Sequence, residues 1–146
     1  MKEIYDNTHF RISHNGEEID FTIDTLPTYA PFNAPFAILT AWNPNNQPLS
    51  LEENTTRNEE LFEKLLEYGH PFDEALGYLE EHSEESYCIY EITFEEAIEL
   101  AKAFEQYAIF YRGNNTVGYY EVETSHIVTE RSLSLTNDFR HQAIDA

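Results

Sequence analysis

A stretch in the first half of the chain carries side chains that could together bind a small anion. Residues 37–61 read "AILTAWNPNNQPLSLEENTTRNEEL" and contain the only tryptophan, Trp42, followed directly by Asn43. Asn54 and Arg57 stand three residues apart, which places them on one face of a helix with core-directed residues. An arginine there offers a fork of N–H donors to a carboxylate or a phosphate. We therefore expect these four residues to converge on a small pocket.

Two further residues would extend this pocket toward catalysis. Gln106 adds another amide, and Glu85 would serve as general acid or base. That role requires a perturbed carboxyl group beside a positioned donor. A purely structural interpretation stays open, in which Trp42 closes the core, Asn43 holds a turn and Arg57 pairs with a buried carboxylate. In either case we expect Trp42 to be mostly buried, with polar atoms at the strand end near its indole N–H.

The remaining chemistry-bearing residues form no recognised motif. Residues 80–85 place four carboxylates around His82 but lack the spaced oxygen ligands and the glycine of an EF-hand loop. The histidines show no H-E-x-x-H pattern, and no G-x-S-x-G, P-loop or dinucleotide-binding motif occurs. Cys88 alternates with large apolar residues, as a small core residue would. We expect no metal and no cofactor.

Acidic residues dominate the charge. Asp and Glu total 28 against 8 Lys and Arg, a formal net charge of −20. Such a field repels nucleic-acid phosphates and anionic membranes over about 8 Å at physiological salt. We therefore expect a solvated acidic surface with no direct nucleic-acid or membrane binding. The alternative is a DNA mimic that inhibits a basic DNA-binding protein, its carboxylates standing in for phosphates.

The length of 146 residues suits a single domain with its own core. We expect the core to cover about residues 5–124, with residues 125–146 as a C-terminal extension that is either an extra element or partly ordered. The lone cysteine excludes an internal disulfide, and the first residues lack the apolar region of a signal peptide. Both features predict a cytoplasmic protein.

Apolar periodicity predicts strands in both halves of the chain. Asn15-Gly16 favours a tight hairpin turn and lies midway between two alternating runs. Phe36–Trp42 is an almost continuous apolar run, typical of a strand that is covered by other elements. The expected strands are two within residues 9–23, which form the hairpin, and one each at residues 36–42, 87–92, 108–112 and 117–123.

Two capping boxes predict the main helices. Ser50 with Glu53 precedes a helix over Leu51–Tyr68, and Thr93 with Glu96 precedes a second one. In each pair the first side chain can accept a hydrogen bond from the backbone of the second residue, which satisfies an otherwise unpaired N–H group.

The order ββ-β-α-β-α-ββ predicts an α+β fold, a two-layer sandwich in which a mixed sheet of about six strands carries both main helices on one face. Residues 70–85 are ambiguous and could hold a short helix interrupted by Gly77. In this arrangement Asn43 follows the end of a central strand, where open sheets with parallel crossovers tend to bind ligands.

Four stretches carry a resemblance to a known family. They are Thr40–Pro44, Asn54 with Arg57, Glu84–Tyr87, and Phe104 with Gln106. Together they resemble a bacterial family, the domain of unknown function 3293, over about residues 5–124 and in matching order. The family often has a Gly- and Asp-Pro-containing loop where this chain has "GYLEEHSEES", so a site that includes this loop would be altered here. The resemblance implies no known activity.

Two classes of function follow from these features. The first is a non-catalytic binding or regulatory module whose partner is a protein or small molecule not identified by the sequence. The second is a small enzyme or sensor that binds an anionic small molecule near Trp42, Asn43, Asn54 and Arg57. Because the sequence holds no recognised catalytic constellation, we favour the binding module. The sequence does not specify an oligomeric state.

Overall fold

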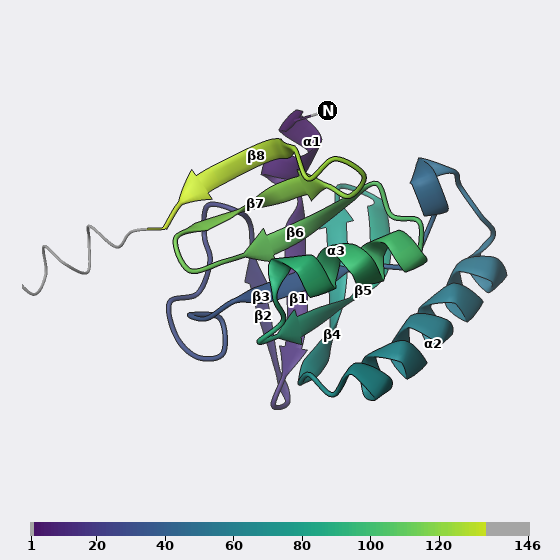
Figure 1. The fold of residues 1–146 in the computed structure, drawn as a ribbon, viewed down its shortest axis with the longest axis horizontal. Helices are drawn as coiled ribbons and strands as arrows, with labels where there is room; N and C mark the ends of the chain where they lie inside the picture. The colour runs from purple at the N-terminus through teal and green to yellow at the C-terminus, as the bar shows by residue number, and fades with distance from the viewer. Residues whose placement is uncertain (1, 134–146) are drawn as a thin grey trace, which may run out of the picture.

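A single antiparallel sheet forms the frame of the molecule (Figure 1). The computed structural model describes residues 2–133. Neighbouring strands pair in the order β2-β1-β4-β5-β3-β6-β7-β8. The strands are β1 (His9–His14), β2 (Glu17–Phe21), β3 (Phe36–Leu39), β4 (Phe72–Leu79), β5 (His82–Tyr90), β6 (Ala108–Arg112), β7 (Thr116–Glu121) and β8 (Ile127–Ser132). The fold is therefore α+β, as expected.

The expected mixed sheet of about six strands was wrong in strand number and direction. The sheet has eight strands, and all neighbouring pairs are antiparallel. The largest difference lies at residues 70–85, which enter a long hairpin of β4 and β5 in place of a helix around Gly77. Leu79 pairs with His82 across the turn, where Glu80 has a φ of 56°. Antiparallel neighbours can be joined by such a short turn and need no crossover helix.

The two ends of the described chain lie at the sheet. The expected N-terminal hairpin forms from β1 and β2, with Asn15 and Gly16 at positive φ, and β1 also pairs with β4. At the other end, β8 pairs with β7 and extends the sheet past residue 124, the end of the expected core. The rest of the expected C-terminal extension, from residue 134, lies outside the described residues.

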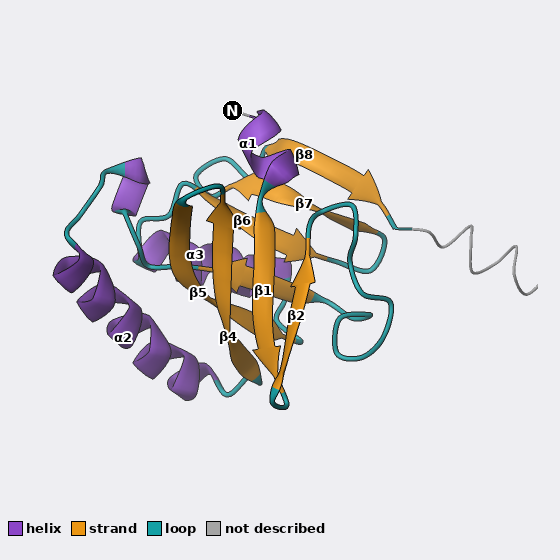
Figure 2. Ribbon diagram, turned by 180° about the vertical axis from the view of Figure 1, so that it is seen from behind, coloured by secondary structure: helices purple, strands orange, loops and turns teal. Residues whose placement is uncertain are grey.

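Both main helices begin at the expected capping boxes. Ser50 and Thr93 each accept a hydrogen bond from the backbone of a glutamate three residues later, at the starts of α2 (Leu51–Tyr68) and α3 (Phe94–Ala103). A short helix that we did not expect, α1 (Lys2–Asn7), lies beside β8 (Figure 2). No helix within residues 2–133 has the length and apolar character needed to cross a membrane.

The sheet separates two apolar cores. Both main helices contribute to the first, through Leu61 and Leu65 of α2 and Ala97 and Leu100 of α3. The second core, on the opposite face, is rich in phenylalanine and is covered by residues 22–35. All four residues of β3 are buried between the two cores, which accounts for the continuous apolar run there.

Candidate functional site

The structure brings Asn43 and Asn54 together at the start of the connection between β3 and α2. The backbone N–H of Asn43 donates to Asn54 Oδ1 at 2.9 Å, and Asn54 Nδ2 donates to Asn43 Oδ1 at the same distance. Asn43 Oδ1 also accepts from the backbone N–H of Leu49 at 3.0 Å. Asn43 has a φ of 47°, a left-handed conformation that asparagine tolerates better than most residues. The two carboxamides thus hold the loop that leads into α2.

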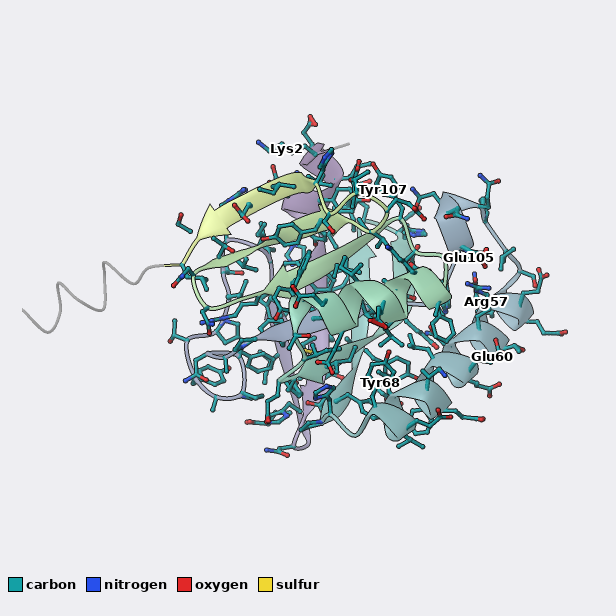
Figure 3. The ribbon with its side chains drawn as sticks, in the orientation of Figure 1. Lys2, Arg57, Glu60, Tyr68, Glu105 and Tyr107 are labelled. Carbon is teal, nitrogen blue, oxygen red and sulfur yellow. The ribbon has the colours of Figure 1, made fainter. Side chains whose placement is uncertain are left out.

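Arg57 uses its donors on backbone carbonyls. Its Nε donates to the carbonyl oxygen of Ala41 and its Nη2 to that of Phe104, each at 2.6 Å. Its Nη1 lies 3.6 Å from Glu105 Oε1, and Figure 3 shows these two side chains facing each other across the gap between α2 and the end of α3. The side chain is 22% exposed. Arg57 therefore connects α2 to the segment after β3 and to the segment after α3. Its partners are mainly carbonyl oxygens, whereas the structural interpretation of the sequence had a buried carboxylate as its partner.

Gln106 and Trp42 complete this connection. Gln106 Nε2 donates to the carbonyl oxygens of Trp42 and Phe104, both at 3.1 Å. Trp42 is only partly buried, and its indole Nε1 is sealed from solvent without a hydrogen-bond partner in the described residues. We expected polar atoms at the strand end to serve that N–H, and this expectation was wrong.

Sequence reasoning missed Asn58, which is 4% exposed and lies one helical turn after Asn54. Its Oδ1 accepts from the backbone N–H of Ala41 at 2.9 Å, and its Nδ2 donates to the carbonyl oxygen of Glu85 at 2.8 Å. The signal was available, because residues i and i+4 share a helix face. Glu85 enters the arrangement through this carbonyl, which also accepts from Thr40 Oγ1 at 2.6 Å.

We call these residues, Asn43, Asn54, Arg57, Asn58 and Gln106, the β3–α2 network. Their convergence has a different cause from the one we expected, because the sheet formed by residues 2–133 contains no parallel crossover. The antiparallel neighbour β5 and the end of α3 supply the facing backbone groups. A network whose donors and acceptors are already satisfied within the chain suits a structural role. Ligand binding at these residues stays a prediction.

A cavity of about 510 Å³ lies on the other face of the sheet, where α1 meets the strands. Its apolar part continues the second core and includes Phe10, Ile38, Phe110 and Tyr119. Its polar part comes from α1 and the residue after it, from the connection between β3 and α2, from the β4–β5 hairpin and from the segment before β6. These polar lining residues are Tyr5, Thr8, Thr40, Asn46, Tyr78, Glu80, His82, Glu84, Ser86, Gln106 and Tyr107. We call this space the α1 cavity.

Glu84 is the carboxylate that links this cavity to the β3–α2 network. It accepts a hydrogen bond from Asn43 Nδ2 at 3.3 Å, and His82 Nε2 lies 3.0 Å from the same oxygen. Within residues 2–133, no lysine or arginine forms an ion pair with Glu84, and none lines the cavity. The cavity is therefore bordered by carboxylates, and one arginine, Arg11, lies over the ring of the lining residue Tyr78, 5.1 Å from the ring centroid.

Two tyrosines of the cavity are protonated at neutral pH. Burial, with smaller contributions from Tyr107, Glu84 and Glu121, raises the pKa of Tyr5 to about 12. Burial also raises the pKa of Tyr119 well above its ordinary value of 10.0. The nearby Thr8 side chain lowers this pKa slightly, but no donor or acceptor of the described residues meets the sealed Tyr119 hydroxyl with hydrogen-bond geometry. A buried polar atom without a partner is costly and is rare in folded proteins.

The central part of the chain is similar to one known family. Residues 39–109 match the family described as "Protein of unknown function (DUF3293)". We call residues 39–109, which are similar to this family, the DUF3293 segment. The resemblance inferred from the sequence motifs is thus confirmed over these residues. No curated protein and no solved structure matches the chain.

The DUF3293 segment contains the β3–α2 network and one side of the α1 cavity. The rest of the cavity comes from outside it, with Tyr5 and Phe10 on the N-terminal side and Phe110 and Tyr119 on the C-terminal side. Sequence reasoning missed these four residues because they are far apart in the chain and carry no motif. Of the expected site residues, Gln106 lines this cavity, whereas Glu85 lines a smaller polar hollow of about 290 Å³ beside Arg11.

The cysteine of the DUF3293 segment is not an activated nucleophile. Cys88 is fully buried, as expected, and burial raises the pKa of its thiol far above the ordinary value. A thiol in that state is a poor nucleophile, because the thiolate is the reactive form. Within residues 2–133, the His, Cys, Asp and Glu side chains form no group of three placed to share a metal ion.

Proposed function

We propose that this chain is a non-catalytic binding module that holds a small molecule in the α1 cavity. The observation that carries this proposal is the cavity itself, about 510 Å³ in volume, with an apolar lining that includes Phe10, Ile38 and Phe110. Ligand sites commonly have volumes of about 300–1,000 Å³, with a mainly apolar lining and a few polar groups.

The packing around the cavity supports a preformed site. The ring of Phe110 lies 4.8 Å from that of Phe10 and 5.1 Å from that of Tyr119, between centroids. These rings belong to the second core, whose other side is filled by residues 22–35. A ligand would therefore meet a lining that is already ordered, which lowers the entropy lost on binding.

The helix α1 supplies the opposite wall and is fixed to the sheet. Asp6 accepts a hydrogen bond from Thr129 Oγ1 at 2.7 Å and lies 3.3 Å from Arg131 Nη2. Both partners belong to β8. A ligand that contacts Tyr5 would thus displace β8 through α1. Binding would then alter the protein surface that β8 forms.

The state of the titratable groups supports binding over catalysis. Tyr5 and Tyr119 are neutral hydrogen-bonding groups at pH 7, as ordinary tyrosines are, and burial raises their pKa values further from neutrality. A catalytic base needs a pKa near the working pH, and raised tyrosine pKa values move away from it. The nearest sulfur nucleophile of the chain, Cys88, lies within the core.

A fragment library screened by thermal melting tests the proposal. We expect a subset of fragments to raise the melting temperature of the parent chain and to be recovered chemically unchanged. Ala108 lines the cavity, so Ala108→Phe should abolish these shifts. Leu66→Phe is the matched control, because Leu66 is exposed on α2. Fragments that stabilise the Ala108→Phe and Leu66→Phe variants equally, or no stabilising fragment at all, would contradict the proposal.

A small enzyme is the second candidate, and one observation favours it. His82 Nε2 lies 3.0 Å from Glu84 Oε2 at the edge of the cavity, and the imidazole is 68% exposed. A carboxylate can orient and hold a histidine that acts as a general base. In this case a cavity fragment would be converted to a product, and His82→Gln would abolish the conversion while leaving fragment binding intact.

A further inference from the structure

We propose that the α1 cavity selects an organic cation, an ammonium group carried on an apolar body. The ammonium group would lie beside the Glu84 carboxylate and against the tyrosine rings of the cavity. This inference rests on the proposed function, because it names the chemical class of the ligand for the same site.

The charge of the lining is the first reason. Glu80 and Glu84 both border the cavity, and the described lining residues include no lysine or arginine. A third carboxylate, Glu121, accepts a hydrogen bond from Tyr107 of the lining at 2.6 Å. Carboxylates at the edge of a low-dielectric cavity attract cations and repel anions more strongly than they would in water. The net charge of −20 acts in the same direction.

Glu84 differs from the paired carboxylates elsewhere in the molecule. Asp6 and Asp20 each lie within 4.0 Å of an arginine nitrogen. Glu84 instead accepts from a neutral amide of Asn43 and from His82, whose charge depends on its protonation. Its side chain is 28% exposed. Its negative charge is therefore held in position and still available to a cation.

The aromatic lining is the second reason. The rings of Tyr5 and Tyr119 lie 4.6 Å apart between centroids, at an angle of 44°. Phe10 and Tyr107 add further rings to the same cavity. A cation within about 6 Å of an aromatic centroid is attracted to the ring face, and aromatic sites of this kind recognise quaternary ammonium groups.

The Tyr119 hydroxyl is the third and independent reason. It is buried, lacks a partner within the described residues, and belongs to a residue that lines the cavity. A hydroxyl oxygen can accept a hydrogen bond from an ammonium N–H, and its O–H can donate to a polar group on the ligand body. Because this hydroxyl is sealed in the structure, a bound amine would satisfy it only after the Tyr119 side chain rotates to bring the oxygen to the cavity.

Three probes that share a phenyl ring test the inference by titration calorimetry. They are benzyltrimethylammonium, benzyl alcohol and phenylacetate, which are a cation, a neutral molecule and an anion. We expect the cation to bind about tenfold more tightly than the alcohol, a difference of about 1.4 kcal/mol. We expect phenylacetate not to bind.

Variants assign the effect to the named side chain. Glu84→Gln keeps the size of the side chain and removes its charge, so it should weaken cation binding about tenfold and leave the alcohol unaffected. Glu63→Gln is the matched control, because Glu63 is exposed on α2. The melting temperature of Glu84→Gln shows that the variant is folded. A primary amine, benzylamine, should lose affinity in Tyr119→Phe, which deletes only the hydroxyl.

The outcomes separate this inference from the proposed function. Two outcomes overturn the proposal of an organic cation and leave the proposed binding module intact. In the first, the cation and the alcohol bind equally; in the second, the Glu84→Gln variant binds the cation as tightly as the parent does. The same holds if none of the three probes binds while other library fragments still bind in the cavity. A chain that binds nothing in the cavity overturns the binding module itself.

Discussion

The β3–α2 network and the α1 cavity are both rich in polar groups, but they differ in what these groups contact. In the network, Asn54 and Asn58 are 2% and 4% exposed, and each bonds to groups of the same chain. In the cavity, the buried Tyr119 hydroxyl has no partner within the described residues, and Glu84 lacks a permanent cation.

This difference shows why polar composition alone is a poor guide to a ligand site. Carboxamides and an arginine clustered near a strand end predicted a pocket, yet they hold backbone groups that would otherwise be buried unpaired. The cost of an unpaired buried group, about 1–3 kcal/mol, explains why such residues occur there. Binding capacity is better sought where the chain leaves polar groups unsatisfied.

The largest expected effect is on the network. Asn58→Ala leaves the N–H of Ala41 and the carbonyl of Glu85 without this partner, so the free energy of unfolding should fall by about 3 kcal/mol. Urea unfolding followed by circular dichroism measures the loss. Glu59→Ala, an exposed neighbour on α2, should change the stability by less than about 0.5 kcal/mol. Similar stability of both variants would contradict a structural role for Asn58.

Arg57 should show a somewhat smaller loss. Arg57→Ala removes two hydrogen bonds to carbonyls and should lower the free energy of unfolding by about 2 kcal/mol. Arg57→Lys should recover only part of it, because an ammonium group cannot reproduce the fork. A fully stable Arg57→Ala chain, combined with stabilisation of the parent by phosphate, would instead favour the anion site that we considered from the sequence.

The cavity should behave in the opposite way. Tyr119→Phe removes a hydroxyl that has no partner, so the free energy of unfolding should rise by about 1 kcal/mol. The control is Tyr111→Phe, because the Tyr111 hydroxyl donates to the carbonyl oxygen of Ile92 at 2.9 Å. That variant should lose about 1 kcal/mol. If both variants lose stability equally, the Tyr119 hydroxyl has a partner and the contrast between the two regions is weakened.

The smallest effect concerns the attachment of α1 through Asp6. The hydrogen bond from Thr129, together with nearby Arg131, lowers the pKa of Asp6 below its ordinary value of 3.8. A lowered pKa in the folded state stabilises the fold above pH 3.8, and this contribution is lost as the pH falls through the folded pKa.

The parent should therefore be more stable than Asp6→Asn at pH 6, and the difference should begin to shrink near pH 3.8 and disappear below the lowered pKa of Asp6 in the folded state. Urea unfolding at a series of pH values checks this. A stability difference that stays constant down to pH 2.5 would show that the carboxylate of Asp6 does not hold α1.

Local signals account for the parts of the fold that were predictable. The capping boxes at Ser50 and Thr93 and the turn at Asn15-Gly16 act within a few residues, so they specify helix starts and a hairpin regardless of the rest of the chain. The β4–β5 hairpin turns at Glu80 instead, without the Asn-Gly or Asp-Gly pair that marks such turns, and it was therefore left ambiguous.

The candidate site was also predictable only in the part that depends on local signals. Helix spacing predicted that Asn54 and Arg57 would meet the end of the preceding strand, and they do. Helix spacing could not predict that Arg57 would donate to backbone carbonyls. One of these carbonyls belongs to Phe104, and its position depends on where α3 ends. The cavity was beyond prediction, because the Tyr5 and Tyr119 rings are brought together only by the pairing of the whole sheet.

The central claim is that ligands bind in the α1 cavity and do not bind at Asn54 and Asn58 of the β3–α2 network. The most direct test is an amide chemical-shift map of the ¹⁵N-labelled chain titrated with benzyltrimethylammonium. The account predicts saturable shifts at cavity residues such as Tyr5, Gly77 and Tyr107, with the amides of Asn54 and Asn58 unchanged. Shifts centred on Asn54 and Asn58, with the cavity residues unaffected, would contradict it.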